Sequence, residues 1–203
     1  MQLMGVDTGF TREDHHGPVW ADLDEDHLPC TVQADAVIGE SAKVAVFLSG
    51  FRVFPTGVST RLSVRLRDGQ DEATENQMIN DVFDDSWTHF PSPSADTSRL
   101  TWWFEFSDGR SAYGVDDALR EELHATADAG APAVPSRPVL VGGAGSGIGG
   151  PLSVERDFWL WPLPSPGVLR VHCAWSALGV ALTTVNLDAD ALLHAAGQAR
   201  RLW

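Results

Sequence analysis

Residues Phe158 to Leu187 read FWLWPLPSPGVLRVHCAWSALGVALTTVNL, and this stretch decides the fold class. Short apolar runs flanked by proline and glycine are typical of buried strands rather than of helices. Within the stretch, Leu169, Val171 and Cys173 alternate with polar residues, as they would on a strand that is buried on one face. The stretch therefore predicts antiparallel β structure, with Trp175 as a core residue on the same face.

A second pair of strands is predicted further back in the chain. Ala42 to Phe54 is apolar almost throughout, which indicates a strand buried on both faces. After a Pro-Thr-Gly turn, residues 58–67 alternate strictly between aliphatic and polar side chains, which predicts that Arg61, Arg65 and Arg67 face solvent. The two segments are expected to form a hairpin.

The rest of the chain adds another hairpin and two helices. Asp108 and Gly109 are a strong two-residue turn signal between the strand at 100–106 and the strand that follows the turn. A short helix is predicted over Val115 to Ala125. A longer helix is predicted over 189–203, with Asp188 as its N-cap and an apolar face that runs from Leu192 to Trp203.

Many hairpin-linked strands with a firm helix only at the end predict a mainly β fold. We expect an antiparallel β-sandwich, loosely immunoglobulin-like, with the C-terminal α-helix packed on one sheet. Residues 1–40 are predicted to form an acidic, partly ordered N-terminal arm. Residues 41–203 are predicted to form a single β-sandwich domain, which carries a long acidic loop (68–97) and a Gly/Pro-rich connector (129–150).

Composition narrows the range of functions. The chain has 203 residues, a hydrophobic fraction of 43% and eight tryptophans, as expected of a globular protein. Its net charge of −14 argues against binding nucleic acid or an anionic membrane over the whole surface. No signal-peptide pattern is visible at the start, and no apolar run is long enough to span a bilayer. We therefore expect a cytoplasmic protein.

Motifs of cofactor and metal chemistry are weak in this sequence. Gly145 to Gly150 matches the dinucleotide-binding glycine pattern on paper, but a proline follows where a helix is needed, so a flexible loop is the better interpretation. His27 and Cys30 have a permissible zinc spacing, and His15 and His16 lie nearby, but a second ligand pair is missing. No cofactor, metal ion or catalytic residue is predicted.

Aromatic side chains offer a candidate contact surface. Trp159 and Trp161 share one face of their strand, opposite Phe158 and Leu160, and exposed aromatic rows bind sugars or partner proteins. In the alternative that we favour, the C-terminal helix covers the outer pair. Trp103, on the strand at 100–106, is a further candidate.

The arginine row at 61–67 is the other candidate surface. A row of like charges needs acids nearby, and the chain's own segment Asp71 to Asp85 or a partner molecule could supply them. We expect the chain's own segment to do so. The candidate partner-binding residues are Arg61, Arg65, Arg67, Trp103, Trp159 and Trp161.

Four segments carry a resemblance to known proteins: PTGV at 55–58, FSDGRSA at 106–112, DFWLWPLPSPG at 157–167 and HCAWSALGV at 172–180. On these the chain, from about Val44 to Trp203, resembles a family of uncharacterised actinobacterial proteins of similar length. The resemblance implies a bacterial, cytoplasmic, single-domain protein. It assigns no activity and no site residue.

The sequence thus favours a non-catalytic cytoplasmic bacterial protein–protein interaction or scaffold module. Its expected partner is another protein, and neither nucleic acid nor a membrane. One alternative is a small-molecule-binding protein or enzyme whose site lies under the 68–97 loop. A second alternative is an acidic decoy that imitates a nucleic-acid-like surface.

Overall fold

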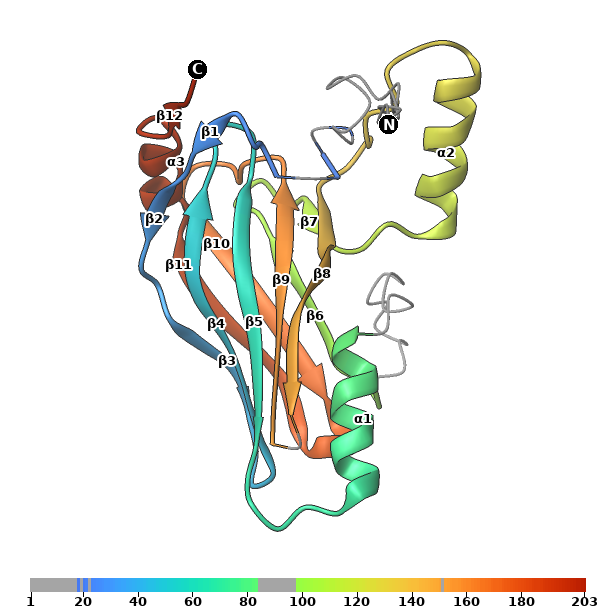
Figure 1. Ribbon diagram of the computed structural model, residues 1–203, viewed down its shortest axis with the longest axis vertical. Coiled ribbons are helices and arrows are strands. Elements are labelled where there is room, and N and C mark those ends of the chain that lie inside the picture. The colour runs from blue at the N-terminus through green and yellow to red at the C-terminus, as the bar shows by residue number, and fades with distance from the viewer. Residues whose placement is uncertain (1–17, 19, 22, 84–97, 151) are drawn as a thin grey trace, which may run out of the picture.

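The computed structural model describes residues 18, 20–21, 23–83, 98–150 and 152–203, and it describes side chains in these ranges except those of residues 144–150. The elements, in chain order (Figure 1), are β1 His27–Leu28, β2 Cys30–Val32, β3 Ala36–Glu40, β4 Val44–Val53, β5 Val58–Leu66, α1 Glu72–Phe83, β6 Thr101–Glu105, β7 Ser111–Ala112, α2 Asp117–Asp128, β8 Val139–Gly150, β9 Ser153–Trp161, β10 Val168–Trp175, the 3-10 turn Ser176–Leu178, β11 Val180–Asp188, α3 Ala189–Ala196 and β12 Arg200–Arg201.

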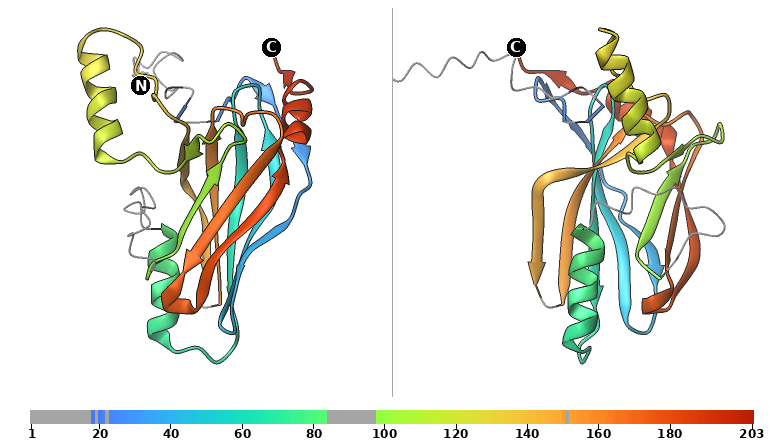
Figure 2. Two further views of the ribbon diagram at one scale, coloured as in Figure 1. Left: turned by 180° about the vertical axis from the view of Figure 1, so that it is seen from behind. Right: turned by 90° about the vertical axis from the view of Figure 1, so that its right-hand side faces the viewer.

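The strands form two antiparallel sheets that face one another. The six-stranded sheet has the order β2-β4-β5-β9-β8, with β3 also paired to β4, and the four-stranded sheet has the order β11-β10-β6-β7. Strands β1 and β12 form a separate pair. Figures 1 and 2 show the two sheets as layers, with α1 and α2 on the β8 side and α3 on the β2 side. The prediction of a mainly β chain with antiparallel sheets and a C-terminal helix is confirmed.

One hydrophobic core lies between the two sheets. Trp102 of β6 and Phe158 of β9 meet across it, with an edge-to-face contact of 4.9 Å between ring centroids. Trp175 is fully buried in this core, which confirms the sequence prediction, and Cys173 on the same face is buried with it. Removal of these apolar side chains from water is the main stabilising contribution of such a core.

The hairpin of β4 and β5 contains Arg61 and Arg65 of the predicted arginine row. Strand β5 buries its aliphatic side chains as predicted, with Arg61 exposed and Arg65 half-buried. Arg67, just after the strand, is exposed, whereas Ser59 and Ser63 on the predicted solvent face are buried. The prediction that β4 is buried on both faces is wrong, because its outward side chains are half-buried or exposed. The guanidinium of Arg65 lies 5.5 Å from the ring centroid of Phe47 and covers part of that outer face.

The ends of the chain differ from the sequence prediction. Helix α3 is capped by Asp188, whose carboxylate accepts hydrogen bonds from two backbone amides of the first turn. The helix ends at Ala196 and does not continue to residue 203, because Gly197 disfavours continuation and the following segment pairs with β1. Trp203 is 72% exposed and donates a hydrogen bond to Asp26, so it does not belong to the buried face of the helix.

Two segments predicted as irregular contain regular structure. Within the predicted loop 68–97, Glu72 to Phe83 forms α1, where Asp71 accepts hydrogen bonds from the amide and hydroxyl of Thr74. Residues 84–97 lie outside the described residues. Within the predicted connector 129–150, Val139 to Gly150 forms β8, so the flexible-loop prediction for its glycines is also wrong.

The glycine content of β8 has a steric cause at one position. A Cβ atom on Gly142 would lie 2.3 Å from the guanidinium of Arg156. Arg156 belongs to β9 and points toward the interior, where it donates to the carbonyl oxygen of Val82 on α1. A side chain at residue 142 would displace this buried arginine.

The two sheets are tied to each other at both edges. At one edge, the hydroxyl of Thr183 on β11 donates to the carbonyl oxygen of Ile38 on β3. At the other edge, the amide of Leu140 on β8 donates to the carbonyl oxygen of Tyr113, just after β7, at 3.0 Å. Within the predicted N-terminal arm, residues 36–40 are therefore part of the body, while residues 1–17 lie outside the described part.

Candidate functional site

The arginine row on β5 is paired with acids of the neighbouring strand β9. Arg61 makes a two-point contact with Asp157, at 2.7 Å from Nε to Oδ1 and 3.1 Å from Nη2 to Oδ2, and this pairing raises the pKa of Arg61. Glu155 lies between Arg61 and Arg65 and forms an ion pair with each. We call Arg61, Arg65, Glu155 and Asp157 the charge ladder.

The source of these acids corrects the sequence interpretation. The sequence predicts that the segment Asp71 to Asp85 supplies acids to the arginine row. For Arg61 and Arg65, however, the acids come from β9, 90 or more residues further along the chain. Arg67 forms no ion pair with a described residue at this face. The ladder therefore accounts for two arginines and leaves the third available.

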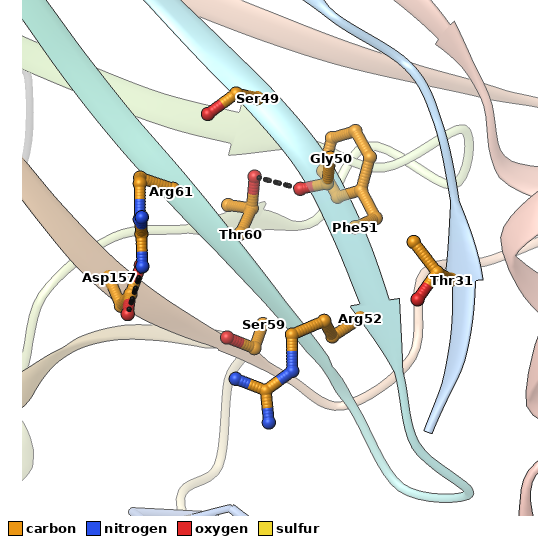
Figure 3. Close-up of a pocket in the computed structure, with 9 residues that line it drawn as sticks. All are labelled: Thr31, Ser49, Gly50, Phe51, Arg52, Ser59, Thr60, Arg61 and Asp157. Carbon is orange, nitrogen blue, oxygen red and sulfur yellow. Dashed lines mark hydrogen bonds and ion pairs between the residues drawn. The ribbon is translucent and has the colours of Figure 1, made fainter. Parts of the chain in front are cut away.

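A pocket opens beside the ladder where β4 contains a bulge. Gly50 has a φ of +61°, and the pairing of β4 with β5 shifts between Ser49 and Phe51. The hydroxyl of Thr60 donates to the carbonyl oxygen of Gly50 at 3.1 Å and fixes the bulge. The pocket holds about 160 Å³ and is lined by Arg52, Ser59 and Arg61 among others (Figure 3). We call it the bulge pocket.

Arg52 and Ser59 are among the polar groups of the bulge pocket that have no ion-pair or hydrogen-bonding partner in the described residues. Arg52 is exposed and forms no ion pair with them; its guanidinium lies 5.7 Å from the ring centroid of Phe54. Ser59 pairs with Arg52 across the strands and is only 5% exposed, yet its hydroxyl makes no hydrogen bond to a described residue. This hydroxyl lines the bulge pocket, where it is placed to bind water or a ligand oxygen.

A second pocket lies at the far end of the same strands. It holds about 210 Å³, and Lys43, Arg65 and Arg67 line it together with Glu40. The backbone amide of Arg67 donates to the carbonyl oxygen of Lys43, which holds the two cations side by side at the ends of β5 and β4. We call this the tip pocket.

The two pockets and the ladder give this face a charge opposite to that of the whole chain. Its cations are Lys43, Arg52, Arg61, Arg65 and Arg67, and the carboxylates among the same described residues are Glu40, Glu155 and Asp157. Cations therefore exceed anions here, although the chain carries a net charge of −14. A local excess of this kind favours contact with an acidic group.

The tryptophan pair of β9 is packed into the protein. Trp159 is 3% exposed and contacts Phe54 edge to face, with 5.6 Å between ring centroids. Trp161 is half-buried and packs with a small cluster around Leu119 and Leu123 of α2. The cover therefore comes from the β4–β5 turn and from α2, and not from the C-terminal helix as expected. Trp159 is therefore too buried to contact a partner.

Trp103 alternates with the buried Trp102 and Phe104 of β6, so it lies on the outer face of the four-stranded sheet. No described helix crosses that face (Figure 2). Its indole stacks on the imidazole of His172, with 4.6 Å between centroids. Nδ1 of His172 lies 2.9 Å from the hydroxyl of Thr184, and Nε2 lies 3.4 Å from Glu105. Burial lowers the pKa of His172, which favours the neutral ring, and Glu105 partly offsets this. The contacts form a cross-strand network.

The weak metal candidates have other partners. His27 contacts Asp24 at 2.9 Å, and the thiol of Cys30 lies 3.6 Å from Gln198. Within the described ranges, His, Cys, Asp and Glu side chains do not gather in threes or more at a point where they could share a metal ion. Burial raises the pKa of Cys173 to about 12, so this thiol is not activated.

The dinucleotide-like glycines do not form a phosphate loop. Gly147 to Gly150 pair with Arg156 to Ser153 in an antiparallel hairpin, so a strand follows them and not a helix. The bulge pocket was missed from the sequence, although Gly50 inside a strand pattern is a signal for a bulge.

Across the residues that the structure describes, no helix has the length and apolar character needed to cross a bilayer. Comparison with known proteins found no family model, no curated protein and no solved structure that matches the chain.

Proposed function

We propose that this protein is a non-catalytic, cytoplasmic interaction module, built on a loosely immunoglobulin-like sandwich, that binds an acidic segment of another protein. Its contact surface is the outer face of β4, β5 and β9. The main support for the proposal comes from Arg52. It is an exposed cation that has no carboxylate partner among the described residues, and it lines the same pocket as the hydroxyl of Ser59. An arginine and a hydroxyl in one pocket provide donors suited to a carboxylate.

The charge ladder supports the proposal by fixing the surface in place. Arg61 and Arg65 are held by acids of β9, so β5 and β9 present a rigid frame beside the bulge pocket. Binding surfaces on rigid strands lose little conformational entropy when a partner docks. The remaining cations, Arg52 and Arg67, are then available for a partner.

The test compares three forms of the full chain as bait in the native host. Wild type, the double variant Arg52→Glu/Arg67→Glu and the control Arg120→Glu are cross-linked and captured. Arg120 is an exposed arginine on α2, away from this face. Each captured protein is then made recombinantly and its Kd is measured by titration.

The expected result is a partner whose affinity falls at least about tenfold in the double variant and is unchanged in the control. Its affinity is also expected to fall as salt rises, because exposed charges are screened over about 8–10 Å. A partner that binds all three forms equally would refute this contact surface. Capture of a basic partner that binds the double variant more tightly would favour an acidic face instead.

A further inference from the structure

The geometry points to a two-point ligand: an extended acidic segment whose two carboxylates, six residues apart, occupy the bulge pocket and the tip pocket. This inference rests on the proposed function and specifies the chemistry and spacing of the partner. It is drawn from the positions of Ser59 and Arg52 at one end of the hairpin and of Lys43 and Arg67 at the other.

The spacing follows from strand geometry. Ser59 lines the bulge pocket and Arg65 lines the tip pocket, and both belong to the same strand β5. Six residues of strand at a rise of about 3.3 Å separate the two positions by about 20 Å. An extended peptide rises by a similar amount per residue, so carboxylates at positions i and i+6 reach both pockets.

The bulge pocket suits a carboxylate better than a phosphate group. Arg52 and the hydroxyl of Ser59 are donors to one ligand group, while the neighbouring Arg61 is already paired with Asp157. One available guanidinium balances one carboxylate charge. A phosphate monoester carries up to two negative charges, and a single guanidinium would balance only one of them.

The ladder between the pockets also limits the ligand. Glu155 pairs with Ser63, midway between the two pockets, so an acid at the middle of the bound segment would meet a carboxylate. We therefore expect neutral residues between the two acids. This requirement separates the proposed ligand from a simple run of glutamates, which would suit a diffuse basic surface.

The test uses fluorescein-labelled ten-residue peptides of serine, threonine and glycine, acetylated and amidated at their ends. Four peptides carry two glutamates at i and i+6, two at i and i+3, one glutamate alone, or one phosphoserine and one glutamate at i and i+6. Binding to the full chain is measured by fluorescence anisotropy at low salt. The i,i+6 glutamate peptide is expected to bind at least about tenfold more tightly than each of the other three.

Two variants locate the contact. Arg52→Gln should reduce the affinity for the i,i+6 peptide to that of the single-glutamate peptide, and Ser59→Ala should weaken it by several-fold. Arg120→Gln is the control and should change nothing. Circular dichroism and the melting temperature of each variant show whether the fold is retained.

Equal affinity for the two glutamate spacings, or loss of discrimination without any effect of Arg52→Gln, would overturn the inference. A captured partner that depends on Arg52 and Arg67 while spacing has no effect would leave the proposed function standing and refute the two-point ligand alone. Tighter binding of the phosphoserine peptide would replace the carboxylate with a phosphate group.

Discussion

A methyl group added at Gly57 should destabilise the protein through one identifiable contact. Gly57 is in the turn between β4 and β5, where the backbone amide of Phe54 donates to the carbonyl oxygen of Gly57 at 2.9 Å. A Cβ atom here would lie 2.5 Å from Cζ2 of Trp159 and 2.7 Å from the carbonyl oxygen of Leu160. Because Gly57 does not have a left-handed φ, an alanine meets no backbone strain, and the cost is purely steric.

The magnitude follows from the lack of space around Trp159. Its side chain is 3% exposed and is held against Phe54, so it cannot move away without loss of packing. Overpacking of this kind costs about 1–3 kcal/mol. For a chain of this size that corresponds to a fall in Tm of about 2–12 °C.

The assay is thermal and urea unfolding of four proteins: wild type, Gly57→Ala, Trp159→Phe and the double variant. Phenylalanine lacks the outer indole atoms that the new methyl group would contact, so Gly57→Ala should cost less in the Trp159→Phe background. The clash with the Leu160 backbone remains, so the relief should be partial. An unchanged Tm for Gly57→Ala, or a cost that is the same in both backgrounds, would show that Trp159 does not restrict the space at residue 57.

Further expected outcomes concern the core, the ladder and the outer face of the other sheet. Trp175→Ala should lower the free energy of unfolding by about 3–5 kcal/mol in urea titrations, and an unchanged midpoint would remove Trp175 from the core. A double-mutant cycle of Arg61→Gln with Asp157→Asn should give a coupling of about 0.2–1 kcal/mol, small because the Arg61 side chain is 47% exposed; zero coupling would argue against the pair. The pKa of His172 in the folded state lies below its ordinary 6.5, so the unfolded chain binds the proton more readily, and stability should fall as pH is lowered through 6.5. His172→Gln should make this pH dependence of stability shallower, and an identical slope in wild type and variant would contradict the expectation. EDTA should leave the Tm unchanged, and a fall on chelation would reveal a bound metal ion.

Most of the correct sequence predictions rested on the local alternation of apolar and polar residues. The buried and exposed faces of β5 could be assigned from residues 58–67 alone, since one face of a strand must enter the core. The partners of its arginines could not, because Glu155 and Asp157 come from a distant strand whose pairing with β5 is a property of the fold.

The predictions that were wrong for β8 and α1 have physical causes that cannot be read from a single sequence. Strand β8 contains many glycines, and at Gly142 the reason is a buried arginine on the neighbouring strand. Helix α1 is polar over most of its length, and the side chains that it buries include Met78 and Val82, which is too little apolar surface to give a clear helical period. In both cases a tertiary contact decided the local structure.

The links at both edges of the two sheets have a consequence for how the protein opens. Thr183 joins β11 to β3, and Leu140 joins β8 to the segment after β7, so neither side of the core can hinge apart while these bonds persist. Fluctuations that expose the core must then break contacts at both edges and approach complete unfolding. The amide of Leu140 should accordingly exchange its hydrogen with solvent as slowly as the most protected amides of the central strands, which native-state hydrogen exchange would measure directly.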